Sequence, residues 1–416
     1  MADGSELARL ERHMHAVALL QLETYDHLVP YDLVLDRVWR KRFSVVHRYR
    51  VEGELGDETF FAKLPLEVAG PSESDHVRLI ALRPRVSRES LQRAALRDLA
   101  TAVESAGPRQ LGAVRLPPGT DDQVVVMTAA RGAPLRELVM REVRWRRQHQ
   151  DLDDIFERAG ALLNVFHEHV DHPDAPEALV DREEIVARAL ELVAHLTRIT
   201  SAGQPLADIG PRLVAAVETH LPERLVTRTR FGDFGLTNVL LDEDGIVTAI
   251  DTLGAVRTPP LHDATYFVMA VTSLRPHLVS RGRSIPRERI DGWLRSFWSG
   301  YLGDQPIPRG AVELWFSLRL LERWAAKSKR RMSRATRVST GGALDRPMLA
   351  LTNRSLRVAE GSEPQHASST PSGRRDTELG VRYCTRPMTI TLPTNPCQDH
   401  DYTTSVTPLV TPSAFA

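Results

Sequence analysis

Three polar residues lie near the middle of the chain: Asp233, Asn238 and Asp251. Their side chains could bind a hard cation and accept a proton. Between Asn238 and Asp251 the sequences VLL and IVTAI flank the turn DEDG, which predicts a tight β-hairpin. The hairpin would bring the three side chains together. Carboxylate and amide oxygens suit Mg²⁺, which takes few protein ligands when substrate phosphates complete its coordination. One carboxylate then remains to orient a nucleophile, and phosphoryl transfer needs this division of roles.

A fourth candidate, Lys63, lies in the apolar stretch FFAKLPL, which is typical of a buried strand. An unpaired charge is costly to bury, so we expect Lys63 to have an anionic partner. The plainer interpretation of Asp233, Asn238 and Asp251 is that each caps a turn, as Asp and Asn often do. Their spacing around one hairpin, with a lysine upstream in a strand, favours the functional interpretation.

The first part of the chain predicts a small lobe of mixed structure, residues 1–130. Apolar residues recur at helical spacing over 5–22 and 87–105. Two stretches rich in β-branched and aromatic residues surround a Gly-Asp turn between 43 and 66, which predicts a hairpin, and QVVVMT at 123–128 predicts a further strand. The combination predicts a small α+β lobe in which a sheet carries Lys63.

The remainder predicts a mainly helical lobe over 131–355, which begins at a turn marked by Gly132 and Pro134. One interruption, residues 225–256, is β in character and holds the polar residues described above. The final segment, 356–416, is rich in Ser, Thr and Pro with few apolar residues, which predicts a disordered tail.

The pattern Gly232-Asp233-x-x-x-x-Asn238 followed by Ile250-Asp251 resembles the catalytic and metal-binding loops of the aminoglycoside phosphotransferase family. The resemblance implies an α+β fold with the two lobes of a protein kinase. It implies that Asp233 accepts or orients the proton of the substrate hydroxyl and that Asn238 and Asp251 hold Mg²⁺ on the phosphates of ATP. FFAKLP resembles the third strand of the family, which would place Lys63 on the α and β phosphates.

The same resemblance assigns supporting roles. Glu89, near the start of a predicted helix, is a candidate partner of Lys63, although Gln92 aligns best with that position. Ser44 is a candidate phosphate contact. His167 and Asp263 match positions that support the site from behind, with Asp263 bracing the catalytic loop.

The chain departs from the family at several positions. Phe231 stands where the family usually has His, and Thr252 follows the metal-binding Asp251 in place of an aromatic residue. The segment before Lys63 contains no glycine-rich loop, and Ser44 is the candidate there. These departures leave a second hypothesis open, a pseudokinase or nucleotide-binding scaffold without turnover.

Composition limits the partners. The 54 Lys and Arg balance the 54 Asp and Glu, so net charge indicates no nucleic acid. No apolar run is long enough for a membrane span, and we expect a cytoplasmic location. Cys384 and Cys397 have no metal-ligand spacing, so we expect no catalytic role for them. Basic runs at 141–149 and 323–337 leave a third hypothesis, an adaptor that binds anionic lipid or nucleic acid.

These observations lead to one functional prediction. We expect an ATP- and Mg²⁺-dependent kinase that transfers the γ-phosphoryl group to a hydroxyl of a small molecule such as an aminoglycoside, a sugar or an amino alcohol. Substrate choice in such folds depends on loops whose sequences carry no general signature. The sequence therefore predicts a class of acceptor and no individual compound.

Overall fold

The computed structural model of the 416-residue chain describes twelve segments. They are residues 4–23, 31–40, 44–53, 58–65, 88–106, 110–117, 124–145, 152–200, 202–252, 256–274, 285–330 and 337–361. The described residues divide into two compact units. Unit 1 contains the described residues up to Ala178 and those of Thr227–Ile307, and unit 2 contains those of Leu179–Val226 and those from Pro308 onward. All the candidate site residues belong to unit 1.

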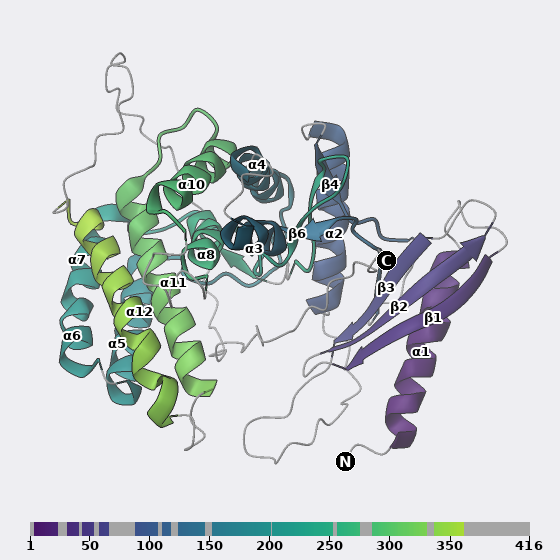
Figure 1. The fold of residues 1–416 in the computed structure, drawn as a ribbon, viewed down its shortest axis with the longest axis horizontal. Coiled ribbons are helices and arrows are strands. Elements are labelled where there is room, and N and C mark those ends of the chain that lie inside the picture. Colours follow the sequence, from purple (N-terminus) through teal and green to yellow (C-terminus); the bar gives the residue numbers. More distant parts are fainter. Residues whose placement is uncertain are drawn as a thin grey trace. The chain divides into compact units, whose positions relative to one another are not determined.

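Unit 1 begins with a helix and an antiparallel sheet of four strands (Figure 1). The sheet order is β1-β2-β3-β5, formed by β1 (Tyr31–Arg40), β2 (Ser44–Gly53), β3 (Glu58–Pro65) and β5 (Val125–Thr128). The predicted hairpin is confirmed as β2 and β3, and the predicted strand at 123–128 as β5. The sequence analysis missed β1, which pairs with β2 along its length and carries a register shift between Leu35 and Arg37.

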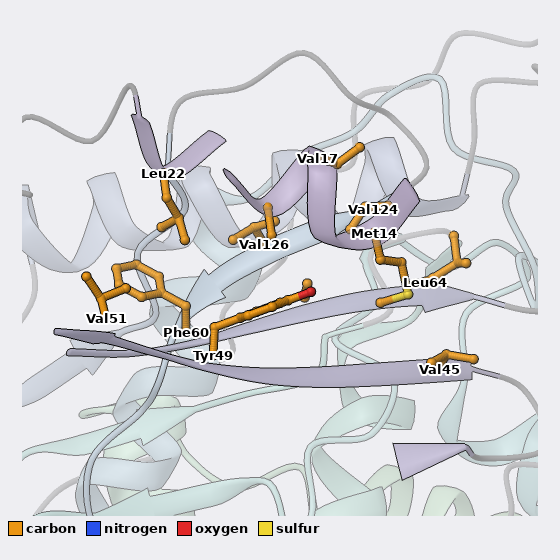
Figure 2. Packing of buried hydrophobic residues seen from close by; sticks show 12 residues of the cluster. Met14, Val17, Leu22, Val45, Tyr49, Val51, Phe60, Leu64, Val124 and Val126 are labelled. Atoms are coloured by element: carbon orange, nitrogen blue, oxygen red, sulfur yellow. The ribbon is translucent and has the colours of Figure 1, made fainter. Parts of the chain in front are cut away.

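Helix α1 (Gly4–Glu23) covers one face of this sheet, as Figure 2 shows. Met14 and Leu22 of the helix are fully buried against Tyr49 and Phe60 of the sheet. The other buried members of this cluster are Val17, Ala18, Val45, Val51, Ala62, Leu64, Val124 and Val126. Because side chains alternate along a strand, the residues between these positions face the opposite side of the sheet. Lys63 is one of them.

The opposite face of the sheet holds a second apolar cluster. Its buried members are Leu96 of helix α2 (Arg88–Ala106), Val114, Val125 and Met127. Ile250, the residue before Asp251, packs against this cluster. Lys63 is paired with Val46 of β2 and Val125 of β5, so it lies in the middle of the sheet. The cluster therefore connects the lysine strand to the candidate metal-binding residue.

A second sheet holds the hairpin that the sequence predicted. Its order is β4-β9-β8-β6, with β4 (Leu111–Ala113), β9 (Val247–Ala249), β8 (Val239–Leu241) and β6 (Ala133–Pro134). Gly245 at the turn of the hairpin has a φ of 78°, which glycine adopts without strain. Strand β4 pairs in parallel with β9, a contact that local sequence patterns did not predict. The hairpin is thus held between strands that come from earlier in the chain.

The described part of unit 1 also contains the helices α3 (Leu135–Trp145), α4 (Leu152–His169), α8 (Pro260–Thr272) and α10 (Arg287–Leu302), and the strand β10 (Arg257–Thr258). Helices α4 and α10 approach closely at two glycines. A Cβ atom at Gly160 would lie 2.0 Å from the carbonyl oxygen of Phe297, and one at Gly300 would lie 1.8 Å from that of Glu157. Only glycine fits at these positions, and the contact fixes α4, which carries His167.

Unit 2 consists of helices. These are α5 (Arg182–Ile199), α6 (Gly203–Ala207), α7 (Ile209–His220), α11 (Arg309–Arg330) and α12 (Arg337–Ala359). Asp181 caps α5 by accepting a hydrogen bond from the Glu184 amide at 2.8 Å. At the end of α12, Glu360 forms an ion pair with Arg212 of α7. The helical pattern expected for the later part of the chain is confirmed in these elements.

The fold class is confirmed: a small sheet-rich N-terminal part is followed by a mainly helical remainder that contains one β-rich interruption. The division into residues 1–130, 131–355 and 356–416 stays a prediction. Most of the expected disordered tail, with Cys384 and Cys397, lies outside the described residues, as do parts of both basic runs. Within the described segments, no helix is both long and apolar enough to cross a membrane.

The packing of α1 on the sheet gives a first prediction. Met14→Ala removes a fully buried side chain, and we expect the free energy of unfolding to fall by about 2–4 kcal/mol. Leu20→Ala on the same helix is the control, because Leu20 is 64% exposed and should change stability by less than about 0.5 kcal/mol. Denaturant unfolding of both variants measures the difference. Equal losses would show that α1 does not dock as described.

Candidate active site

A buried carboxylate organises the loop between β7 (Arg228–Thr229) and β8, which carries Asp233 and Asn238. Asp263 of α8 is fully buried and accepts hydrogen bonds from the backbone amides of Phe231 at 2.6 Å and of Gly232 at 3.1 Å. Gly232 has a φ of 94°, a conformation that residues with a side chain rarely adopt. The bracing role expected for Asp263 agrees with this geometry.

Two further side chains, those of His167 and Tyr301, extend the contacts of Asp263 away from the loop. His167 of α4 lies with Nε2 3.3 Å from the Asp263 carboxylate and Nδ1 2.9 Å from the hydroxyl of Tyr301 on α10. Burial, with added effects of the Asp263 and Glu168 carboxylates, raises the pKa of Tyr301 far above its ordinary value. Tyr301 therefore stays protonated, and its hydroxyl serves the network as a neutral group. Helices α4, α8 and α10 are joined behind the loop in this way.

The two departures around the loop prove to be related. Phe231 is fully buried, and its ring lies 5.0 Å from that of Phe166 and 5.1 Å from that of Phe234. Thr252 is also fully buried, and its hydroxyl donates to the carbonyl oxygen of Phe231 at 3.2 Å. Phe231 is thus held at its amide by Asp263 and at its carbonyl by Thr252. An apolar ring and a small hydroxyl residue together keep the loop in place.

Asp233 occupies a tight turn within the loop. Its carbonyl oxygen accepts hydrogen bonds from the Gly235 amide at 2.8 Å and from the Asn238 side-chain nitrogen at 3.0 Å. The hydroxyl of Tyr266 on α8 donates to the Oδ1 atom of Asp233 at 2.7 Å. Both the backbone and the carboxylate of Asp233 are therefore fixed by named partners.

Asn238 and Asp251 lie at the same end of the β8–β9 hairpin. The backbone amide of Ile250 donates to the carbonyl oxygen of Asn238 at 2.9 Å, which places the two candidate metal ligands on adjacent strand ends. Asp251 has a φ of 62°, a left-handed conformation that is unusual for a residue with a side chain. Such conformations cluster at functional sites because the surrounding structure must maintain them.

Lys63 is expected to have an anionic partner, and in the structure that partner is Asp251. The two side chains form an ion pair across the apolar cluster described above, with the lysine side chain 21% exposed and the aspartate side chain 43% exposed. The Lys63 ammonium group therefore lies beside the candidate metal-binding carboxylate. The structure thus brings Lys63, Asp251, Asn238 and Asp233 into one continuous set of contacts.

The other expected phosphate-binding residues are not described to the same extent. Ser44 is the first residue of β2 and Glu89 lies in the first turn of α2, but both side chains lie outside the described residues. Gln92, the alternative partner of Lys63, is buried in α2 with 5% of its surface exposed. The roles expected for Ser44 and Glu89 stay predictions.

The oxygen atoms of the site suit a small, hard cation that also binds ligands from outside the protein. Among the described residues, no three His, Cys, Asp or Glu side chains come together as a complete metal site. Asp251 and the amide of Asn238 offer two oxygen donors, which suits Mg²⁺ when phosphate oxygens supply the remainder. Asp233, held separately by Tyr266, is the second carboxylate of the site.

Two contacts of the site, those of Tyr266 and Thr252, do not follow from the sequence patterns. Tyr266 follows Asp263 by three positions on α8, so the two side chains lie on the same side of the helix. That spacing is a signal for a second contact with the loop. For Thr252, no local pattern indicates the hydrogen bond it donates to Phe231.

The Asp263 network gives a second prediction. Asp263→Ala removes the acceptor of two buried amide hydrogen bonds, and we expect it to lower the free energy of unfolding by about 3 kcal/mol or more. We also expect the amides of Phe231 and Gly232 to lose hydrogen-exchange protection. Asp304→Ala is the control, because Asp304 is exposed after α10. If the two amides stayed protected in Asp263→Ala, the proposed bracing would be wrong.

The chain is similar to several solved structures. A similarity in structure links it to an amicoumacin kinase solved with AMP-PNP, Ca²⁺ and amicoumacin, at 14% identity with a TM-score of 0.48 over 81% of this chain and 93% of that one. A spectinomycin phosphotransferase solved with ADP and spectinomycin shows 11% identity and a TM-score of 0.47 over 82% of this chain and 97% of that one. A choline/ethanolamine kinase family protein from Mesorhizobium loti shows 15% identity and a TM-score of 0.46 over 83% of this chain and 99% of that one.

A search of curated proteins found no match. The family model described as the phosphotransferase enzyme family matches residues 57–309, which is more than half of the chain and includes Lys63, the catalytic-loop residues and Asp263. The assignment rests on this family model and not on the structural similarities. The chain therefore belongs to the phosphotransferase enzyme family.

Proposed function

We propose that the protein is an ATP- and Mg²⁺-dependent kinase that transfers the γ-phosphoryl group of ATP to a hydroxyl of a small molecule. The observation that carries the proposal is the convergence of Asp233, Asn238 and Asp251 at one end of the β8–β9 hairpin, with Lys63 paired to Asp251. Family membership supports the reaction class. The acceptor is proposed as a class: an aminoglycoside, a sugar, an amino alcohol or a similar metabolite.

Each residue has a distinct role in this proposal. Asp233 accepts or orients the proton of the acceptor hydroxyl, because its carboxylate is held at a defined position by Tyr266. Lys63 binds the phosphates of ATP. Asn238 and Asp251 hold Mg²⁺, which when bound neutralises charge on the phosphate oxygens. The protein's contribution is mainly alignment of the two reactants and electrostatic stabilisation.

The ion pair between Lys63 and Asp251 supports this assignment of roles. Lys63 lies in the middle of a sheet, beside the carboxylate of Asp251, whose backbone is left-handed. A cation and an anion therefore lie together at one partly exposed position. A phosphate group with its Mg²⁺ presents the complementary pair of charges. Both side chains can therefore exchange their mutual contact for contacts with the metal and the phosphate without either charge being left unpaired.

The nucleotide site gives a third prediction. At ATP and Mg²⁺ concentrations about a hundred times the dissociation constant, ligand binding stabilises a protein by about 2.7 kcal/mol, which raises its melting temperature by several degrees. We expect this stabilisation in the wild type with Mg²⁺, and its loss in Asp251→Ala. Thermal unfolding with and without Mg²⁺ measures it. A wild-type protein that ATP does not stabilise would contradict the nucleotide site.

Turnover gives a fourth prediction, and Asp233→Asn is the matched variant because it leaves the metal ligands unchanged. We expect Asp233→Asn to retain Mg²⁺-dependent ATP binding and to lose acceptor-dependent ADP release by about 10²- to 10⁴-fold. ADP release should be measured over a panel of aminoglycosides, sugars and amino alcohols. Binding of ATP by the wild type without ADP release from any acceptor would favour the pseudokinase instead.

A further inference from the structure

Helix α8 directs two polar side chains at the catalytic loop from one side of the helix. Asp263 holds the backbone of Phe231 and Gly232, and Tyr266, three residues later, holds the carboxylate of Asp233. Only 7% of the surface of Tyr266 is exposed. The same helix thus fixes the main chain of the loop and, by a separate contact, the orientation of the side chain that performs the chemistry.

Gly235 lies beside the ring of Tyr266. A Cβ atom at position 235 would be 3.4 Å from the Cε1 atom of Tyr266, 3.9 Å from the Oδ1 atom of Asp233 and 4.0 Å from the Cβ atom of Ala270. These are ordinary van der Waals distances, so the tyrosine ring packs over the backbone turn that follows Asp233. Its hydroxyl reaches the Asp233 carboxylate at 2.7 Å.

We infer that Tyr266 is a positioning residue for the phosphoryl transfer proposed above, on which this inference rests. Its hydroxyl fixes the rotation of the Asp233 carboxylate. A hydrogen bond to a charged acceptor is stronger than one between neutral groups. A carboxylate that receives a proton from an acceptor hydroxyl must be aligned with it, and Tyr266 supplies that alignment.

The first test does not require turnover. In protein labelled with ¹³C at the aspartate carboxyl, the NMR signal of Asp233 is identified from its absence in Asp233→Asn. We expect Tyr266→Phe to shift this signal at a fixed pH, because the carboxylate loses a hydrogen-bond donor. Lys63, Asp251, Asp263 and His167, the ionisable groups around the loop, are the same in both proteins. An unchanged signal would overturn the inference.

Two further proteins keep this test decisive. Tyr49→Phe removes a buried tyrosine hydroxyl that is 2.9 Å from His47 in the N-terminal sheet, and it should leave the Asp233 signal unchanged. Replacement of all seven tyrosines with 3-fluorotyrosine makes the phenol a stronger donor without changing its shape much. We expect it to shift the Asp233 signal in the direction opposite to that of Tyr266→Phe. This measurement remains available if Tyr266→Phe fails to fold, and the absence of any shift would argue against the inference.

Kinetics give the second test, once an acceptor is known. We expect Tyr266→Phe to lower kcat by roughly tenfold to a hundredfold and to leave KM for ATP within about twofold of wild type. A purely structural role would change kcat and KM for ATP together, and such a joint change would contradict the inference. If wild-type protein transfers no phosphate, the proposed function fails, while the NMR comparison still decides the effect of Tyr266 on Asp233.

Discussion

The arrangement of the site depends on the buried carboxylate of Asp263. A carboxylate that is removed from water is tolerated only when donors surround it, and here two backbone amides and a histidine lie around it. Any movement of the loop away from α8 would leave the charge without the two amide donors. The energetic penalty of that state keeps the backbone of Phe231 and Gly232 in place. It thereby also fixes where the residues that follow them in the loop begin.

The departures from the family pattern are better understood as a set than one at a time. An apolar ring at Phe231 extends a chain of aromatic contacts through Phe166, Phe234 and Phe267 into the helical part of unit 1. The hydroxyl of Thr252 then satisfies the carbonyl oxygen of Phe231, which would otherwise be a buried acceptor among apolar groups. Loss of one polar side chain is thus accompanied by a hydrogen bond from another part of the chain.

Elements whose evidence is local could be predicted from the sequence. Apolar periodicity predicts the helices α1 and α2. Turn chemistry predicts the β2–β3 hairpin and the Asp-Gly hairpin, which is flanked by Asn238 and Asp251. Contacts between distant segments could not be predicted in this way: the parallel pairing of β4 with β9, the Lys63–Asp251 pair and the hydroxyls of Tyr266 and Thr252. Strand β1 does not show in the sequence because the register shift between Leu35 and Arg37 breaks its alternation, so that Val38 lies three positions after Leu35.

The parallel pairing of β4 with β9 has a consequence for biosynthesis. Leu111 leaves the ribosome long before Val247, its partner in the sheet, and parallel pairing between segments so far apart in the chain forms slowly. The β8–β9 hairpin can close by itself as soon as it is made, but the edge of β4 must wait for it. A nascent chain that stops before β9 therefore lacks the strand that pairs with β4, and unpaired strand edges of this kind are prone to aggregation.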